Sequence, residues 1–177
     1  MKTLIPICLF FALTGCNSAD EAPTKVQTAD EIVSTSATPP PAPTVSYEAL
    51  MVSSDTVGPF TVTHDDLEIK LSYYSRAGVQ NLMESVTQDY EYLGYLALES
   101  AYQFGPNQFV LIVSTGQSGR SCPATTYAIA FDARGENVSG STKIEGCSEI
   151  VQVFADGNEM KIKKEAGTTV IYNAHIE

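Results

Sequence analysis

Three segments of this chain contain residue types that could do chemistry. The first, His64-Asp65-Asp66, places an imidazole beside two carboxylates, a combination that can bind a cation or assist a base. The segment links two apolar runs, however, and aspartate is common in the turns that join strands. We therefore interpret it as a turn.

The other two segments lack the patterns that their chemistry would need. Residues 114–121 are rich in Gly and Ser, but they have neither the lysine-bearing pattern of a phosphate-binding loop nor the Gly-x-Ser-x-Gly pattern of a hydrolase. Asp132, Glu136 and Asn137 offer oxygen atoms to calcium, without the spacing of a full calcium-binding loop. We predict a mobile loop and a turn, and we expect no catalytic group, metal or cofactor.

The cysteines indicate a disulfide. The chain has four, two of them in its first sixteen residues, which leaves Cys122 and Cys147. An even pair in an oxidising compartment most simply forms a disulfide. A zinc site is the alternative, but it needs further ligands, and the two histidines, His64 and His175, lie far away in the sequence.

The N-terminus has the parts of a secretory signal peptide. Lys2 precedes an apolar run over residues 4–13, and small residues follow it. As a helix this run reaches about 15 Å, half of the ~30 Å hydrocarbon core of a bilayer, so it is too short to span a membrane. A generic signal peptide with an incidental cysteine is the alternative.

The end of this run, Leu13-Thr14-Gly15-Cys16, resembles the lipobox of bacterial lipoprotein precursors. The resemblance implies a cut between Gly15 and Cys16, a lipid on the Cys16 sulfur and an acylated amine, and so an anchor in the cell envelope. Asn17 is not the aspartate that signals retention at the inner membrane in many Gram-negative bacteria. The resemblance therefore implies delivery to the outer membrane, and it leaves open which side the protein faces.

Composition divides the chain into three parts. Residues 1–15 form the signal peptide, and residues 16–46 contain the lipidated cysteine and a segment without aromatic residues that includes Pro39-Pro40-Pro41-Ala42-Pro43. Such a segment cannot bury enough apolar surface to fold, so we expect a disordered tether with a stiff polyproline section. Residues 47–177 have the size of one disulfide-bonded domain.

The domain shows mainly the two-residue period of strands. Residues 67–71 alternate between apolar and polar, and residues 109–113 are apolar on both faces, as in a central strand. Residues 132–137 and 156–158 are typical of hairpin loops, and residues 168–172 of a last strand. We predict a mainly β fold, an antiparallel sheet in a sandwich or a partly open barrel, with α+β as the alternative.

One segment has a helical period instead. Its apolar residues recur at i, i+3, i+4, i+7 and i+11, which places them on one face of a helix. The pattern predicts a helix over about 77–88, packed on the sheet. The residues of this stripe are Val79, Leu82, Met83, Val86 and Tyr90.

The net charge of −11 disfavours binding to nucleic acid and to anionic membrane surfaces, and it favours attraction of basic partners. Tyrosines among carboxylates supply contact area and hydrogen bonds of the kind used in recognition. Strand alternation must turn some of them inward. The candidate partner-binding residues are Tyr90, Glu91, Tyr92, Tyr95, Glu99 and Tyr102.

These patterns favour a binding protein over an enzyme. We expect a lipoprotein of the cell envelope, attached to the membrane through its N-terminal lipid, whose acidic domain binds a basic envelope protein in an inhibitor, immunity or assembly role. The alternative is an envelope hydrolase or sugar-active enzyme with Asp/Glu pairs. Glycoside chemistry requires two carboxylates at a set separation, which a sequence does not reveal.

Overall fold

The structure is a computed structural model, and it describes residues 44–65, 68–116 and 122–177. These residues belong to a compact unit that extends from Pro41 to Glu177. The predicted signal peptide, Cys16, most of the predicted tether, Leu67 and most of the Gly- and Ser-rich loop lie outside the described residues.

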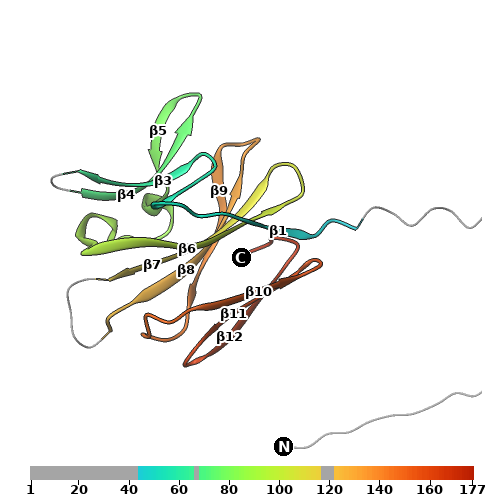
Figure 1. Ribbon diagram of the computed structural model, residues 1–177. Coiled ribbons are helices and arrows are strands. Elements are labelled where there is room, and N and C mark those ends of the chain that lie inside the picture. The colour runs from blue at the N-terminus through green and yellow to red at the C-terminus, as the bar shows by residue number, and fades with distance from the viewer. Residues whose placement is uncertain (1–43, 66–67, 117–121) are drawn as a thin grey trace, which may run out of the picture. The chain divides into compact units, whose positions relative to one another are not determined.

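The described chain folds into three antiparallel sheets, so the prediction of a mainly β, antiparallel fold is confirmed (Figure 1). The central sheet has the order β1 (Tyr47–Leu50), β6 (Tyr95–Phe104), β7 (Gln108–Gly116), β8 (Thr125–Asp132) and β9 (Asn137–Ile144). A four-stranded sheet contains β2 (Thr56–Val57), β3 (Phe60–Asp65), β4 (Glu68–Ser75) and β5 (Gly78–Asn81). A three-stranded sheet contains β10 (Gln152–Asp156), β11 (Glu159–Lys164) and β12 (Gly167–Tyr172).

The central sheet carries an apolar core on each face, which makes the fold three layers deep. Successive residues of a strand point to opposite faces. In β7, Leu111 and Val113 contribute to the core under the four-stranded sheet, whereas Val110 and Ile112 contribute to the core under the three-stranded sheet. The prediction of a central strand that is apolar on both faces is therefore confirmed.

Aromatic rings fill the core under the four-stranded sheet. The ring of Phe60 lies edge-on to those of Phe109 and Phe131, at 5.4 and 5.2 Å between centroids. Tyr73 of β4 packs on Phe131 of β8 at 4.5 Å. Edge-to-face packing of this kind stabilises a core beyond the area that it buries, so it fixes the four-stranded sheet on the central one.

A β-bulge in β6 changes which face its side chains take. Leu98 pairs with Val113 and Ser100 with Ile112, so Glu99 is the extra residue. Before the bulge Leu98 points to the core under the four-stranded sheet. After it, Tyr102 and Phe104 point to the core under the three-stranded sheet.

The predicted helix over 77–88 is wrong. Residues 78–81 form β5, which pairs with β4, and residues Leu82–Ser85 form a single 3-10 turn, η1. Gly78 takes a φ of +125°, and the Ser75 hydroxyl donates to its carbonyl at 2.7 Å, which closes a hairpin where the helix was expected. Among the described residues no helix is long and apolar enough to span a bilayer.

The apolar residues that suggested the helix do not all lie on one buried face. Val79 is exposed and lies opposite Tyr74 on the neighbouring strand. Leu82 and Met83 are buried in the core, and Asn81 caps η1 by accepting a hydrogen bond from the Met83 backbone at 3.2 Å. Val86 and Tyr90 also pack against this core. The helical spacing therefore arises from four core-facing residues in and next to short 3-10 turns, and not from one helix.

The predictions of two hairpins, of a last strand and of the disulfide are confirmed. Strands β8 and β9 form one hairpin around residues 133–136, and β10 and β11 form a second around residues 157–158. Strand β12 is the predicted last strand. Cys122 and Cys147 form a disulfide with 4.8 Å between their Cα atoms, which joins the open ends of β8 and β9. Two loop predictions are wrong for the residues that the structure describes, since residues 114–116 of the expected mobile loop belong to β7, and His64 and Asp65 of the expected turn belong to β3.

Candidate functional site

Three carboxylates and one tyrosine line a hollow of about 380 Å³. Its residues come from three separate segments, namely Glu68 at the start of β4, Glu84 in η1, and Tyr90 and Glu91 in the short 3-10 helix η2 (Tyr90–Tyr92). We call it the acidic hollow. It contains two of the six residues that the sequence suggested for partner binding, Tyr90 and Glu91.

The core anchors the segments that form the acidic hollow. Leu82 and Met83 are buried next to Glu84, so η1 cannot move away from the sheet. The ring of Tyr90 packs against the same core, and its hydroxyl donates to Glu91 at 3.4 Å. The hollow is thus a built feature of the fold, since two short turns are fixed beside the start of β4.

The electrostatics of the acidic hollow favour a positive ligand. The charge of Glu91 raises the pKa of Tyr90, and partial burial, Glu84 and Glu68 add to the effect. All three carboxylates therefore act on one phenol. Lys70 forms an ion pair with Glu68 at 2.8 Å and with Asp65 at 3.5 Å, so Glu84 and Glu91 contribute most of the uncompensated negative charge.

The structure does not bring the six candidate residues together in one surface. Tyr92 is 70 % exposed and follows Glu91 in η2. Tyr95 lies at the opposite face of the central sheet from Tyr90, and its hydroxyl donates to the Pro123 carbonyl at 3.2 Å. The Glu99 bulge and strand alternation separate these residues, which the sequence places side by side.

Tyr102 has a structural role. Its ring meets that of Tyr47 edge-on at 6.4 Å in the core under the three-stranded sheet. Burial raises the pKa of Tyr102, while the nearby Ser100 hydroxyl acts in the opposite direction. For Tyr95, burial also raises the pKa, and the charges of Glu149 and Glu99 add to it.

A buried lysine went unnoticed in the sequence. Lys164 is 3 % exposed, and its ammonium donates to the Thr126 hydroxyl at 3.1 Å, which lies 3.0 Å from that of Ser114. Alternation along β11 could have revealed it, because Met160, Ile162 and Lys164 share the inward face. Ser114 and Thr126 are also buried, so this group has the features of a satisfied core network rather than of a catalytic site.

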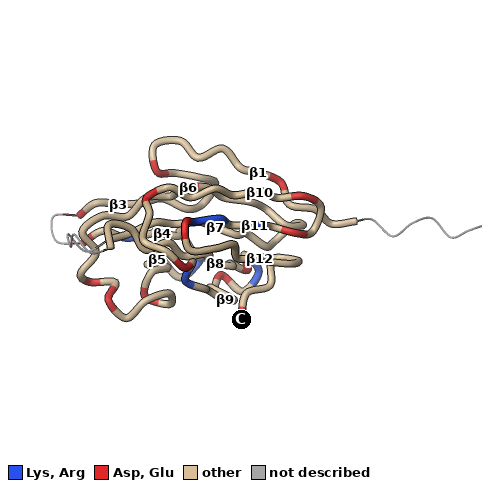
Figure 2. The backbone as a smooth tube through the Cα atoms, turned by 90° about the horizontal axis from the view of Figure 1, so that it is seen from below, with Lys and Arg blue, Asp and Glu red and all other residues tan. Residues whose placement is uncertain are grey.

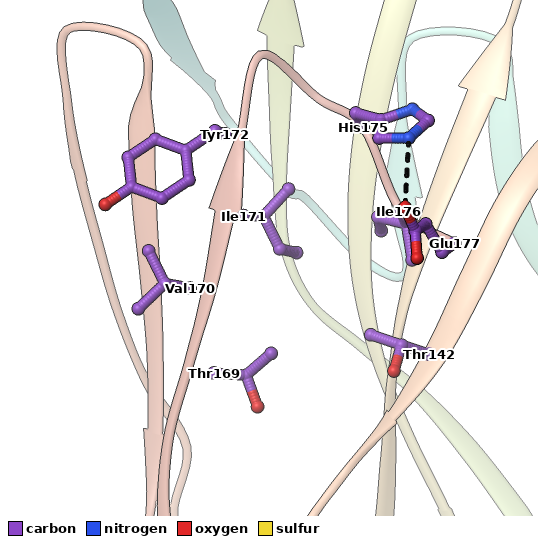
Figure 3. A pocket seen from close by; sticks show the side chains of 8 residues that line it. All are labelled: Thr142, Thr169, Val170, Ile171, Tyr172, His175, Ile176 and Glu177. Atoms are coloured by element: carbon purple, nitrogen blue, oxygen red, sulfur yellow. Dashed lines mark ion pairs between the residues drawn. The ribbon is translucent and has the colours of Figure 1, made fainter. Parts of the chain in front are cut away.

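A second hollow, of about 360 Å³, lies between β9 and β12 (Figure 3). Thr142 lines it from β9 and Thr169 from β12, and the C-terminal residues close one end. The imidazole of His175 lies 4.0 Å from the carboxylate of Glu177, and both side chains are exposed. An exposed imidazole with one carboxylate lacks the nucleophile and the buried orienting group of a hydrolase.

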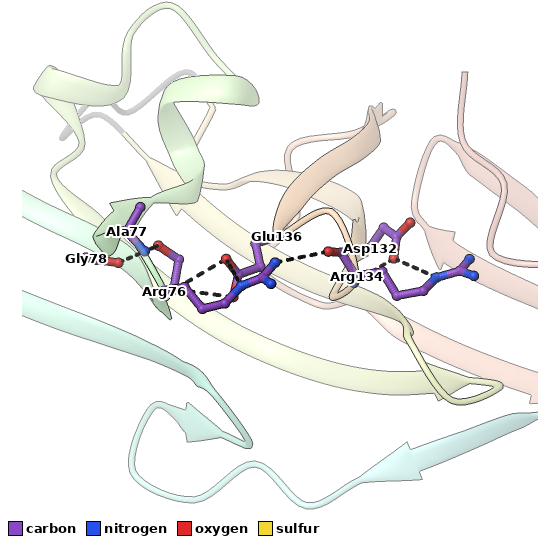
Figure 4. A network of polar contacts seen from close by, with 7 residues as sticks. Arg76, Ala77, Gly78, Asp132, Arg134 and Glu136 are labelled. Carbon is purple, nitrogen blue, oxygen red and sulfur yellow. Dashed lines mark hydrogen bonds and ion pairs between the residues drawn. The ribbon is translucent and has the colours of Figure 1, made fainter.

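The carboxylates considered for calcium contact arginines instead (Figure 4). Glu136 forms an ion pair with Arg76 at 3.2 Å and also accepts from its backbone N–H. Asp132 accepts a hydrogen bond from the Arg134 backbone at 2.9 Å. The Arg76–Glu136 contacts join the turn between β4 and β5 to the turn between β8 and β9, so they position two sheets, whereas the Asp132–Arg134 contact lies within the second turn.

The segment around His64 ends a strand. His64 and Asp65 are the last residues of β3, and β4 begins at Glu68. Asp66 lies outside the described residues. Within the described ranges, no group of three or more His, Cys, Asp or Glu side chains is arranged to hold a metal ion.

Comparison of the chain with protein families, with curated proteins and with solved structures gives no match.

Proposed function

We propose that this protein is an envelope lipoprotein whose folded domain is a non-catalytic binding module for a basic protein, and that the acidic hollow is its contact site. The observation that carries the proposal is the convergence of Glu68, Glu84 and Glu91 on Tyr90 in one open hollow. Carboxylates around an aromatic ring suit a lysine or arginine side chain, which gains both charge pairing and a cation–π contact.

The charge distribution of the domain supports this choice of site. Figure 2 shows acidic residues spread over many turns and strand ends, which gives a general attraction for cations. The acidic hollow differs from these places because it adds shape and a phenol to the charge. Tyr92 beside it is exposed, so an aromatic contact is available at the rim.

The anchor part of the proposal rests on Leu13-Thr14-Gly15-Cys16 and the short apolar run before it. A lipid on Cys16 would attach the domain to the envelope, by resemblance at the outer membrane. An inhibitor, immunity or assembly role fits a tethered binder, because a tether raises the local concentration of the domain for partners in the same compartment.

A capture experiment tests the site. The full mature protein is immobilised and exposed to envelope extract, and bound proteins are quantified at rising salt. We compare Glu91→Lys with Glu99→Lys, which make the same charge change inside and outside the acidic hollow. Capture of a basic protein should fall several-fold for Glu91→Lys and with added salt, since exposed charges are screened within about 10 Å.

Three outcomes would contradict the proposal. Capture that is unchanged by salt, or equally weakened by Glu91→Lys and Glu99→Lys, would exclude the acidic hollow as the contact. Turnover of a cell-wall glycan that Glu84→Gln abolishes would support the alternative, an enzyme in which carboxylates of the same hollow act as acid and base.

A further inference from the structure

The three-stranded sheet presents apolar side chains to solvent. Phe154, Lys161 and Val170 are neighbours across β10, β11 and β12, and Tyr172 follows two residues after Val170. Phe154 is 60 % exposed and Tyr172 is 52 % exposed, whereas alternate residues of the same strands are buried in the core. Large apolar side chains gathered on one face of a soluble domain mark an interaction surface. We call it the outward face.

Two cations share the outward face with two carboxylates, Asp156 and Glu159, and the Tyr172 hydroxyl donates to Glu159 at 2.6 Å. Lys161 and Lys163 are alternate residues of β11, and both are exposed. Lys161 pairs with Glu159, but no carboxylate in the described part of the chain lies within ion-pair distance of Lys163. Aromatic rings with flanking lysines match the chemistry of a phospholipid surface, where rings enter the headgroup layer and ammonium groups meet phosphates.

The N-terminal chain enters the domain beside this sheet. The Tyr47 backbone N–H donates to the carbonyl of Gly157, in the turn between β10 and β11, at 2.8 Å. Its phenol accepts a hydrogen bond from the Ala174 backbone, just past β12, at 2.7 Å. A chain anchored upstream of Tyr47 therefore reaches the domain at one end of the three-stranded sheet, where the β10–β11 turn and the end of β12 lie together.

We propose that the outward face rests on the phospholipid bilayer to which the chain is anchored, with Phe154 and Tyr172 in the headgroup layer and Lys163 on a lipid phosphate. This inference rests on the proposed anchor at Cys16. A coil with as many residues as the predicted tether would span about 30 Å and would keep the face at an effective concentration in the mM range. At such a concentration a small contact area is enough to hold the face on the bilayer, despite the net negative charge of the chain.

The contact gives the protein an orientation. The core under the four-stranded sheet holds Tyr90 of the acidic hollow, and the core under the three-stranded sheet lies on the opposite side of the central sheet. A domain that rests on its outward face therefore presents the acidic hollow away from the bilayer, where a basic partner can reach it.

A single tryptophan reports the contact, because the chain has none. The mature protein with Phe154→Trp is reconstituted in vesicles of phosphatidylethanolamine and phosphatidylglycerol. Its emission should shift to shorter wavelength, and brominated lipids should quench it. The matched control is Tyr92→Trp, a position that is 70 % exposed and lies beside the acidic hollow. Its emission should stay at the wavelength of a solvated indole, without quenching.

A charge reversal tests the role of the lysine. Lys163→Glu in the Phe154→Trp protein should reduce quenching, whereas Lys143→Glu, an equal change on β9, should not. Indole emission that remains unquenched and unshifted in the tethered Phe154→Trp protein would overturn the proposal. A shift that requires envelope extract instead of lipid would also overturn it and would assign the face to a protein.

The experiment distinguishes a protein without a lipid on Cys16 from a lipidated protein whose outward face does not contact the bilayer. A chain without lipid does not float with vesicles, and its Cys16 thiol reacts with a maleimide. That same thiol can then be coupled to a maleimide lipid, which recreates the tether at the same residue. Quenching of the indole in the coupled Phe154→Trp protein would support the outward-face contact, and its absence would refute it.

Discussion

The ammonium nitrogen of Lys164 lies 3.0 Å from the carbonyl oxygen of Gly146, the residue before Cys147. A second carbonyl, that of Ala124 near Cys122, accepts from the same nitrogen at 3.2 Å. Together with the Thr126 hydroxyl, these oxygens satisfy all three donors of a buried cation. The disulfide therefore holds two of the three acceptors in place.

Replacing this lysine should destabilise the domain. Lys164→Met fills most of the space but leaves buried acceptors without a donor, and we expect a loss of about 1–3 kcal/mol in the free energy of unfolding. Urea denaturation followed by circular dichroism measures it. The matched control Lys161→Met, on the exposed face of β11, should change stability little. Equal effects of the two substitutions would refute a special role for the buried ammonium.

The stability difference between wild type and Lys164→Met should depend on pH. Burial lowers the pKa of Lys164 below its ordinary value of 10.5. Between the folded pKa and 10.5 the unfolded chain binds more protons than the folded one, so this lysine makes the free energy of unfolding rise with pH in that window. Tyrosine ionisation affects wild type and Lys164→Met alike. The unfolding free energy of wild type minus that of Lys164→Met should therefore increase with pH in this window. A difference that does not change with pH would contradict the lowered pKa of Lys164.

Reduction of Cys122–Cys147 should weaken the fold. The loop of 25 positions corresponds to about 3.5 kcal/mol in the chain-entropy account of disulfides. We expect no alkylation of these thiols in the native oxidised protein, and a lower unfolding midpoint after reduction. The amine of Lys164 should then react faster with an acylating reagent, as its carbonyl partners loosen. Two thiols alkylated without reductant would exclude the bridge in solution.

A glycine marks where the C-terminal segment crosses β9. A Cβ on Gly140 would overlap the carbonyl oxygen of Ile176, whereas Gly167 has open space around it. Gly140→Ala should lower the unfolding free energy by about 1–3 kcal/mol, the usual cost of overpacking. Gly167→Ala should leave stability nearly unchanged. Thermal unfolding of both variants distinguishes them, and a neutral Gly140→Ala would mean that the C-terminal segment is not seated on β9.

The proposed anchor depends on one sulfur atom. Cys16→Ser removes the thiol that would accept the lipid, so the precursor should accumulate uncut and fail to incorporate labelled fatty acid. A Cys8→Ser variant, which lies inside the predicted signal peptide, serves as control and should be processed normally. Equal labelling of Cys16→Ser and wild type would reject the lipoprotein proposal.

The strands could be predicted because their signal is local. Alternation along residues 127–131 and 160–162 survives in the structure. Strand β8 pairs with β7, and β11 with β12, in an unbroken register, and the register shift between β8 and β9 adds its extra residue, Ser139, to β9. The helix over 77–88 was wrong for a physical reason: apolar spacing does not distinguish a helix from a hairpin followed by a 3-10 turn. The positive φ of Gly78 separates the two, and it is visible only in the fold.

The site was harder to predict because its residues are distant in sequence. Glu68 reaches the acidic hollow through the pairing of β3 and β4, while Glu84 and Glu91 come from two short turns. No spacing rule connects them. One extra residue, Glu99, likewise decides which face Tyr102 takes, and a bulge leaves no clear pattern in composition.

Tyr47 has a mechanical consequence for a tethered domain. Any pull along the N-terminal chain arrives first at this residue, which is bonded to Gly157 and Ala174 and packed on the ring of Phe104 at 4.9 Å. The load is therefore shared at once between the central sheet and the three-stranded sheet, instead of peeling β1 away alone. Tyr47 would thus distribute any tension in the proposed tether over two sheets before it reaches the remaining strands.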